Sequence, residues 1–180
     1  MRSLSSDAAG LVILLHGLAF RSSGKAPQDN NAPLHASATR NEQFNALQSF
    51  QQHVMAPAAA RGWSVLLASD LVMPQAQQTL WTKVCHHSGV KPTHQRIRSS
   101  YGFNLQTDTV KDSLAWVTRV APEAWSMRGA LLLVRVDLVL RRPLQLPPPP
   151  RAGQPGSTMM MVPFVHSMHA TYIHHHLVMC

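Results

Sequence analysis

The sequence predicts an α/β fold, a Rossmann-like three-layer domain with a mostly parallel sheet. Three apolar runs rich in leucine and valine are typical of strands that are buried on both faces of a sheet. Segments with apolar residues at helical spacing lie between these runs, and this alternation favours parallel strands joined by helices. The length of 180 residues suits one domain with a core of its own.

The first half of the predicted domain begins with a strand and a helix. Residues 10–15 form the first apolar run, which ends at His16. Thr39 and Glu42 form a capping-box pattern, which predicts the start of the first helix. Pro57 should kink or break this helix, because proline lacks the amide proton that an interior residue donates. The expected inward face contains Phe44, Leu47, Phe50, Val54 and Met55.

A second strand and helix follow. Gly62 suits the end of the first helix, and residues 63–68 predict the second buried strand, which leads to Asp70. Pro74 suits the first turn of the second helix. The inward face of that helix should contain Leu80, Trp81 and Val84. Residues 86–105 predict an irregular, basic segment.

The last predicted elements are a helix that starts at Thr109 with Asp112 and a strand over residues 130–140. This strand contains two charges, Arg135 and Asp137, and side chains two residues apart lie on the same face of a strand. Burying a charge is costly unless the charge is paired or bound. The two residues therefore form either a structural ion pair or part of a substrate or metal site, and the sequence leaves both interpretations open.

Polar residues gather at the ends of the three predicted strands. Ligands of parallel α/β sheets bind beyond the carboxyl ends of the strands. His16, Asp70 and Asp137 lie at or near those ends, and Arg21 follows the first strand. We therefore expect these four residues, together with Arg135, to line one substrate-binding cleft.

The charge balance favours an anionic partner. The chain has 16 Lys and Arg against 8 Asp and Glu, a formal net charge of +8. The basic residues are scattered, however, and aromatic side chains do not alternate with them as they would in a stacking surface. The composition therefore argues for a small anionic ligand and against nucleic acid.

Several familiar catalytic motifs do not occur in the sequence. It contains no G-x-G-x-x-G dinucleotide fingerprint and no G-x-x-x-x-G-K-[ST] phosphate loop. His16-Gly17 after an apolar strand resembles the oxyanion loop of α/β-hydrolases, but no G-x-S-x-G nucleophile elbow follows. A degenerate hydrolase-like domain and a non-catalytic binding module therefore stand as alternatives.

The character of the sequence changes near its end. We expect a domain over residues 8–145, followed by a proline-rich linker and a poorly structured His- and Met-rich tail over residues 146–180. The histidines of this tail favour adventitious metal binding over a built site. We expect no signal peptide and no transmembrane segment, and the compartment stays unknown.

Two patterns carry a resemblance to a known family. They are the strand that ends in His16-Gly17-Leu18-Ala19-Phe20-Arg21 and the late strand Val134-Arg135-Val136-Asp137-Leu138. Together they resemble a group of algal and protist proteins that is similar to nucleotide-sugar glycosyltransferases of the GT-A type. The resemblance covers roughly residues 11–143.

The resemblance implies a domain that binds a nucleotide diphosphate sugar. In GT-A enzymes an Asp-x-Asp near a strand end holds Mn²⁺ or Mg²⁺ on the diphosphate, and only Asp137 matches that pair here. Arg135 replaces the first acid, and its planar guanidinium suits direct contact with phosphate. The chain ends before the half that would hold the acceptor site, so the resemblance also fits an inactive protein or a fragment.

Overall fold

The computed structural model describes residues 9–20, 36–99, 106–122, 129–149, 159–164 and 174–179. Its strands are β1 (Gly10–Leu18), β2 (Ser64–Val72), β3 (His94–Arg98), β4 (Gly129–Arg135), β5 (Met159–Phe164) and β6 (His174–Met179). Its helices are α1 (Ala36–Phe50), the π-helical segment η1 (Gln51–Met55), α2 (Ala56–Ala60), α3 (Gln75–Ser88) and α4 (Gln106–Val120).

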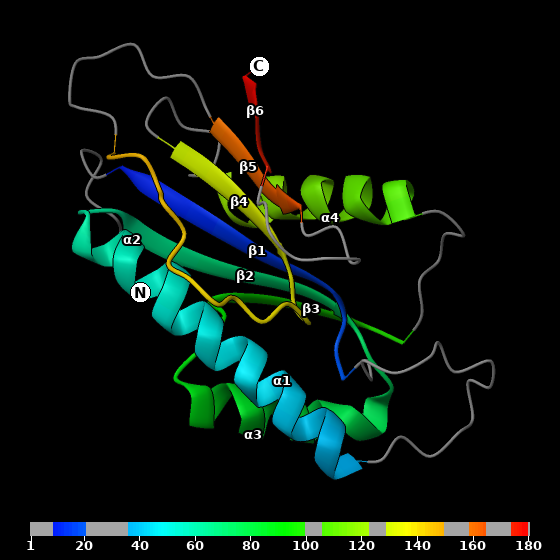
Figure 1. Ribbon diagram of the computed structural model, residues 1–180. Coiled ribbons are helices and arrows are strands. Elements are labelled where there is room, and N and C mark those ends of the chain that lie inside the picture. The colour runs from blue at the N-terminus through cyan, green and yellow to red at the C-terminus, as the bar shows by residue number, and fades with distance from the viewer. Residues whose placement is uncertain are drawn as a thin grey trace.

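The strands form one sheet in the order β3-β2-β1-β4-β5-β6 (Figure 1). The first four strands are all parallel, β5 is parallel to β4, and β6 is antiparallel to β5. The predicted α/β class with a mostly parallel, Rossmann-like sheet is therefore confirmed. The three apolar runs of the sequence are neighbours, as expected, because β1 lies between β2 and β4.

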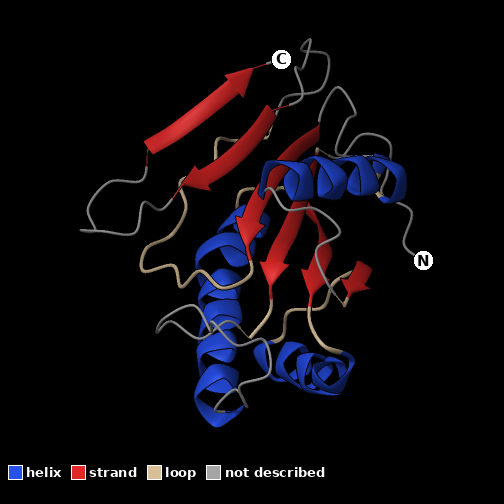
Figure 2. Cartoon of the chain, turned by 90° about the vertical axis from the view of Figure 1, so that its right-hand side faces the viewer, coloured by secondary structure: helices blue, strands red, loops and turns tan. Residues whose placement is uncertain are grey.

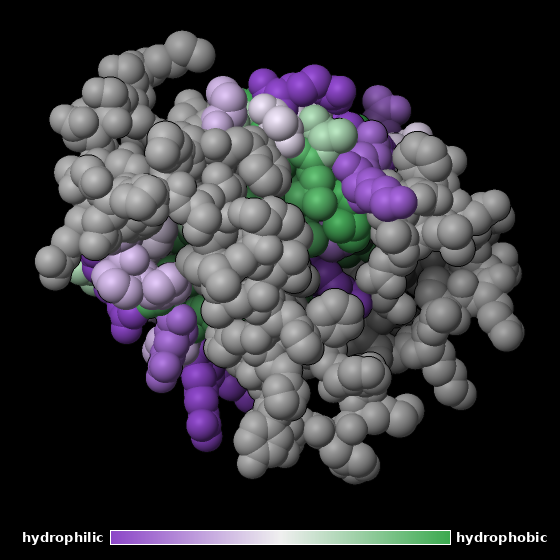
Figure 3. All heavy atoms as spheres, turned by 90° about the horizontal axis from the view of Figure 1, so that it is seen from above, coloured by the Kyte–Doolittle hydropathy of each residue, from purple (hydrophilic) through white to green (hydrophobic). Residues whose placement is uncertain are grey.

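Helices cover both faces of the sheet. Figures 1 and 2 show α1 and α3 on one side and α4 on the other. The alternating side chains of β1 divide accordingly between two cores. Leu11, Ile13 and Leu15 belong to the larger core, under α1 and α3. Val12 and Leu14 pack with Trp116 and Val117 of α4 in the smaller one. From above, Figure 3 shows hydrophobic residues beside hydrophilic ones.

The sheet has a topological switch point between β1 and β4. From β1 the chain proceeds through β2 to β3 at one edge, and α4 then returns it to β4 on the other side of β1. In open α/β sheets ligands bind at the carboxyl ends of the strands beside such a point. This is the edge at which the sequence predicts the site.

Several predicted boundaries are wrong. His16 and Asp70 lie within strands, because the β1–β2 ladder continues to the pair Leu18 and Val72. The last apolar run is a strand only up to Arg135, since a turn follows it.

The segment 86–105 was expected to be irregular, but part of it is helical and part is a strand. α3 extends to Ser88, and His94–Arg98 form the edge strand β3. Two helix starts also differ from the expected positions. α1 begins at Ala36 rather than near Thr39, and α4 begins at Gln106.

Pro57 does not end the helical segment that contains it. The chain stays helical from Ala36 to Ala60, with the π-helical turns of η1 immediately before α2. Pro57 comes just after η1, and the His53 carbonyl four residues before it accepts instead from the backbone N–H of Leu144 at 2.8 Å. Gly62 adopts a φ of 87° just after α2, which agrees with the predicted stop.

The segment after β4 returns along the helices of the larger core. Leu140, Leu144 and Leu146 are buried there. The Trp63 Nε1–H group donates to the carbonyl oxygen of Pro147 at 3.0 Å. Within the predicted tail, β5 and β6 are strands rather than unstructured chain, while the proposed division at residues 145 and 146 stays a prediction.

No helix among the described residues is long and apolar enough to cross a membrane.

Candidate functional site at the carboxyl edge of the sheet

His16 lies at the centre of the switch point. It pairs in register with Asp70 of β2 on one side and with Arg135 of β4 on the other. Val12 and Leu14 of β1 face the core under α4, so His16, two residues further on, faces the same way. The structure therefore brings together three of the predicted site residues on one face of three adjacent strands.

The imidazole of His16 is buried and has an unpaired nitrogen. Its residue is 6% exposed, and Nδ1 has no hydrogen-bond partner among the described residues. Burial lowers the pKa of His16, and the positive charge of Arg135 lowers it further, against opposing contributions from Asp70 and Asp137. Both effects favour the neutral form of the imidazole.

Arg135 and Asp137 form a bidentate ion pair with each other. Arg135 Nε donates to Asp137 Oδ1 at 3.0 Å, and Nη2 donates to Oδ2 at 2.6 Å. The side chains are 41% and 20% exposed, so the pair is accessible to solvent rather than enclosed in the core. Exposed pairs of this kind contribute little to stability, and a stronger anion can displace the carboxylate from the guanidinium.

Asp70 lies in a network of ion pairs, and its predicted part in substrate binding stays a prediction. Its buried carboxylate accepts hydrogen bonds from Arg96, from Arg98 at 2.7 Å and from Ser113 of α4 at 2.6 Å. Asp112 of α4 binds the same two guanidinium groups, each at 2.9 Å. The structure therefore places Asp70 in a neutral network that holds β2, β3 and α4 together.

The sequence reasoning missed the partners of Asp70. Arg96 and Arg98 alternate along the polar strand β3, and this two-residue spacing was the available signal. Arg96 also lies over the Trp116 ring, 5.1 Å from its centroid, which adds a cation–π contact. Ser113 carries no local signal, because its partner is 43 residues away.

Buried hydrogen bonds fix the two loops beside His16. The Gln43 side chain of α1 accepts from the backbone N–H of Phe20 at 2.9 Å and donates to the carbonyl of Val136 at 2.7 Å. The N–H of Val136 donates to the His16 carbonyl at 3.0 Å. Phe20 has a φ of 60°, an uncommon conformation for a residue with a side chain. One glutamine thus links the chain after β1 to the chain after β4.

Two further predictions concern Arg21 and a metal ion at Asp137. Arg21 lies outside the described residues. No three His, Cys, Asp or Glu side chains of the described residues are grouped to hold a metal ion. Both carboxylate oxygens of Asp137 are engaged by Arg135, so the described residues do not assemble a cation site there. The predicted metal role of Asp137 stays a prediction.

Comparisons of the chain with protein-family models, with curated proteins and with solved structures find no match.

Proposed function

We propose that this chain binds a nucleotide diphosphate sugar at the carboxyl ends of β1 and β4, as a glycosyltransferase-like domain. The observation that carries the proposal is the register pairing of His16 with Arg135 at the switch point of the sheet. One buried imidazole and one accessible guanidinium thus lie side by side on one face of the sheet, at its carboxyl edge.

The diphosphate would bind to Arg135. A guanidinium presents two parallel N–H donors that match phosphate oxygens, and Arg135 now uses them on Asp137. A diphosphate carries more charge than one carboxylate, so it would displace Asp137 from the guanidinium. His16 would lie beside the bound group, on the same face of the sheet as Arg135. The net charge of +8 assists the approach of an anion.

Sugar transfer is the reaction that the GT-A resemblance implies, and the proposal commits to donor binding. Asp137 lies in the turn just after β4, which agrees with a strand-end acid. A divalent ion such as Mn²⁺ would need Asp137 to leave Arg135. Nucleotide binding measured with and without Mn²⁺ therefore tests whether Asp137 holds a metal ion.

Calorimetric titration with UDP and with GDP tests donor binding. Arg135→Ala should weaken binding of the favoured nucleotide about 5- to 150-fold, the equivalent of the roughly 1–3 kcal/mol of a lost charge-assisted hydrogen bond. Arg119→Ala, on the exposed surface of α4, is the matched control and should leave affinity unchanged. Failure of the wild-type chain to bind either nucleotide, with or without Mn²⁺, would remove the proposal.

Asp137→Asn separates a phosphate site from a metal site. Without metal this variant frees Arg135, so nucleotide affinity should stay the same or rise. With Mn²⁺ present, affinity should fall if Asp137 holds the ion. Arg21→Ala, which the sequence also places near the site, should weaken binding on the same scale as Arg135→Ala. Affinities that ignore all three substitutions would move the site elsewhere.

A further inference from the structure

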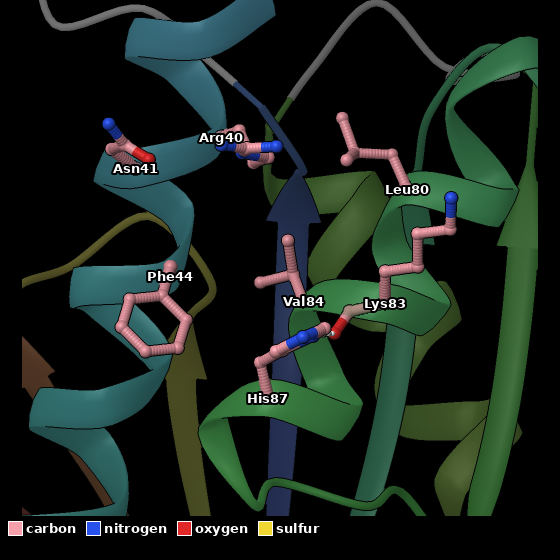
Figure 4. Close-up of a pocket in the computed structure, with 7 residues that line it drawn as sticks. All are labelled: Arg40, Asn41, Phe44, Leu80, Lys83, Val84 and His87. Carbon is pink, nitrogen blue, oxygen red and sulfur yellow. Dashed lines mark hydrogen bonds between the residues drawn. The ribbon is translucent and has the colours of Figure 1, made fainter.

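A groove lies between helices α1 and α3, on the face of the sheet opposite to α4 (Figure 4). Its volume is about 380 Å³, within the range of roughly 300–1,000 Å³ that small-molecule sites occupy. Phe44 of α1 and Leu80 and Val84 of α3 supply an apolar lining that is continuous with the larger core. The groove could therefore take an apolar group without rearrangement of the core.

The polar groups around this apolar lining are basic or neutral. Arg40 and Asn41 come from α1, and Lys83 and His87 come from α3. No acidic side chain lines the groove among the described residues. The ring nitrogen Nδ1 of His87 donates to the Lys83 carbonyl at 2.7 Å, which holds the imidazole against α3.

Arg40 and Lys83 form no ion pair with any described residue, although they lie on facing helices. Two like charges beside an apolar surface complement a ligand with a single anionic head and an apolar body. A helical peptide is a poorer match, because an amphipathic helix needs a long apolar groove with several anchor positions.

We propose that the groove between α1 and α3 binds a small amphipathic carboxylate, with the carboxylate at the basic rim that Arg40 and Lys83 form and the apolar body over Phe44, Leu80 and Val84. This site is independent of the nucleotide site, since it lies on the other face of the sheet.

Titration with straight-chain carboxylates from butanoate to decanoate, below their micelle concentrations, tests the proposal. Affinity should rise with chain length, by up to about fourfold for each buried methylene, and level off once the groove is full. The matching primary alcohols should bind more weakly. Backbone amide shifts in the NMR spectrum should change along α1 and α3.

Two charge variants and their controls make the test specific. Lys83→Met and Arg40→Met keep apolar stems and remove the charges, so each should weaken the carboxylates at least fivefold and leave the alcohols unchanged. Lys91→Met and Arg119→Met, exposed positions outside the groove, should change neither. Three results would each overturn the proposal. The amide shifts could rise linearly with carboxylate concentration without saturating, or the charge variants could bind the carboxylates as tightly as wild type. The shifts could also be confined to the carboxyl ends of β1 and β4.

Discussion

The carboxylate of Asp70 accepts four hydrogen bonds at the edge of the sheet. Burial raises its pKa, but hydrogen bonds from Arg96 and Ser113 and the charges of Arg96 and Arg98 outweigh burial and lower the pKa below its ordinary value. Asp70→Asn leaves two part-buried guanidinium groups short of a partner. The variant should lose about 3–5 kcal/mol of unfolding free energy at pH 7, measured by urea denaturation.

The pH dependence of the unfolding free energy distinguishes an ion-pairing role of Asp70 from simple packing. A depressed carboxyl pKa contributes stability that is present above the unfolded-state value of 3.8 and is lost as the pH falls through the folded-state value. The gap between wild type and Asp70→Asn should therefore narrow in acid. Asp112→Asn is the matched control, because its carboxylate is one-third exposed, and it should cost no more than about 1 kcal/mol. Equal losses from the two variants would contradict this ranking.

The contribution of His16 to stability should also fall in acid, but for a different reason. Burial and Arg135 lower its folded-state pKa below 6.5, so the unfolded chain binds the proton more readily. Stability from His16 should be fully present above pH 6.5 and should fall as the pH drops toward the folded-state pKa. An NMR titration of the imidazole should give a midpoint below 6.5. A midpoint at or above 6.5 would show that the ring is not in this environment.

For single residues, the sequence predicted the position in the sheet better than the chemical role. Strand ends located His16, Arg135 and Asp137 correctly at one edge, since alternation and apolar runs are local signals. The role of Asp70 depends on Arg96 and Ser113, which come from other elements, and no local pattern reports such partners.

At the scale of elements, Gln43 connects α1 to the chain after both β1 and β4. Gln43→Ala would leave the Phe20 amide and the Val136 carbonyl buried without their partner, and each unpaired buried group costs about 1–3 kcal/mol. We expect a fall in unfolding free energy in that range or above. Nucleotide affinity should also fall, because the two loops beside His16 lose their common support.

Gln43→Glu keeps the acceptor for Phe20 but places a carboxylate in a buried site that faces the Val136 carbonyl. At pH 7 it should be no more stable than the alanine variant, and it should regain stability as the pH falls and the carboxyl group becomes a donor. A Gln43→Ala chain with wild-type stability would show that the two hydrogen bonds are not formed in solution.

The apolar strands could be predicted from the sequence, and the polar strand β3 could not. β1, β2 and β4 are continuous apolar runs buried on both faces, which is the pattern of parallel strands. β3 has the sequence His-Gln-Arg-Ile-Arg, and it becomes a strand because Asp70 and Asp112 neutralise its arginines. The π-helical turns before Pro57 likewise arise from accommodation of the proline within one long helical segment.

At the scale of the whole molecule, the described side chains of the two cores come from residues 9–146. β5 pairs with β4 over only three residue pairs, at Met159, Met160 and Met161. A chain that ends at Pro149 should therefore still unfold in one cooperative urea transition, with a lower midpoint because β4 becomes an edge strand. Loss of the cooperative transition would show that the last two strands are an integral part of the domain.

Hydrogen exchange with UDP and Mn²⁺ tests the central claim most directly, because it locates the ligand without a substitution. The account predicts slower amide exchange in peptides that cover Gly17–Phe20 and 135–138, with Arg135→Ala abolishing the effect. Peptides of α3 should exchange as in the free chain. Protection that appears only along α1 and α3, or no protection at saturating nucleotide, would contradict a nucleotide site at the carboxyl ends of β1 and β4.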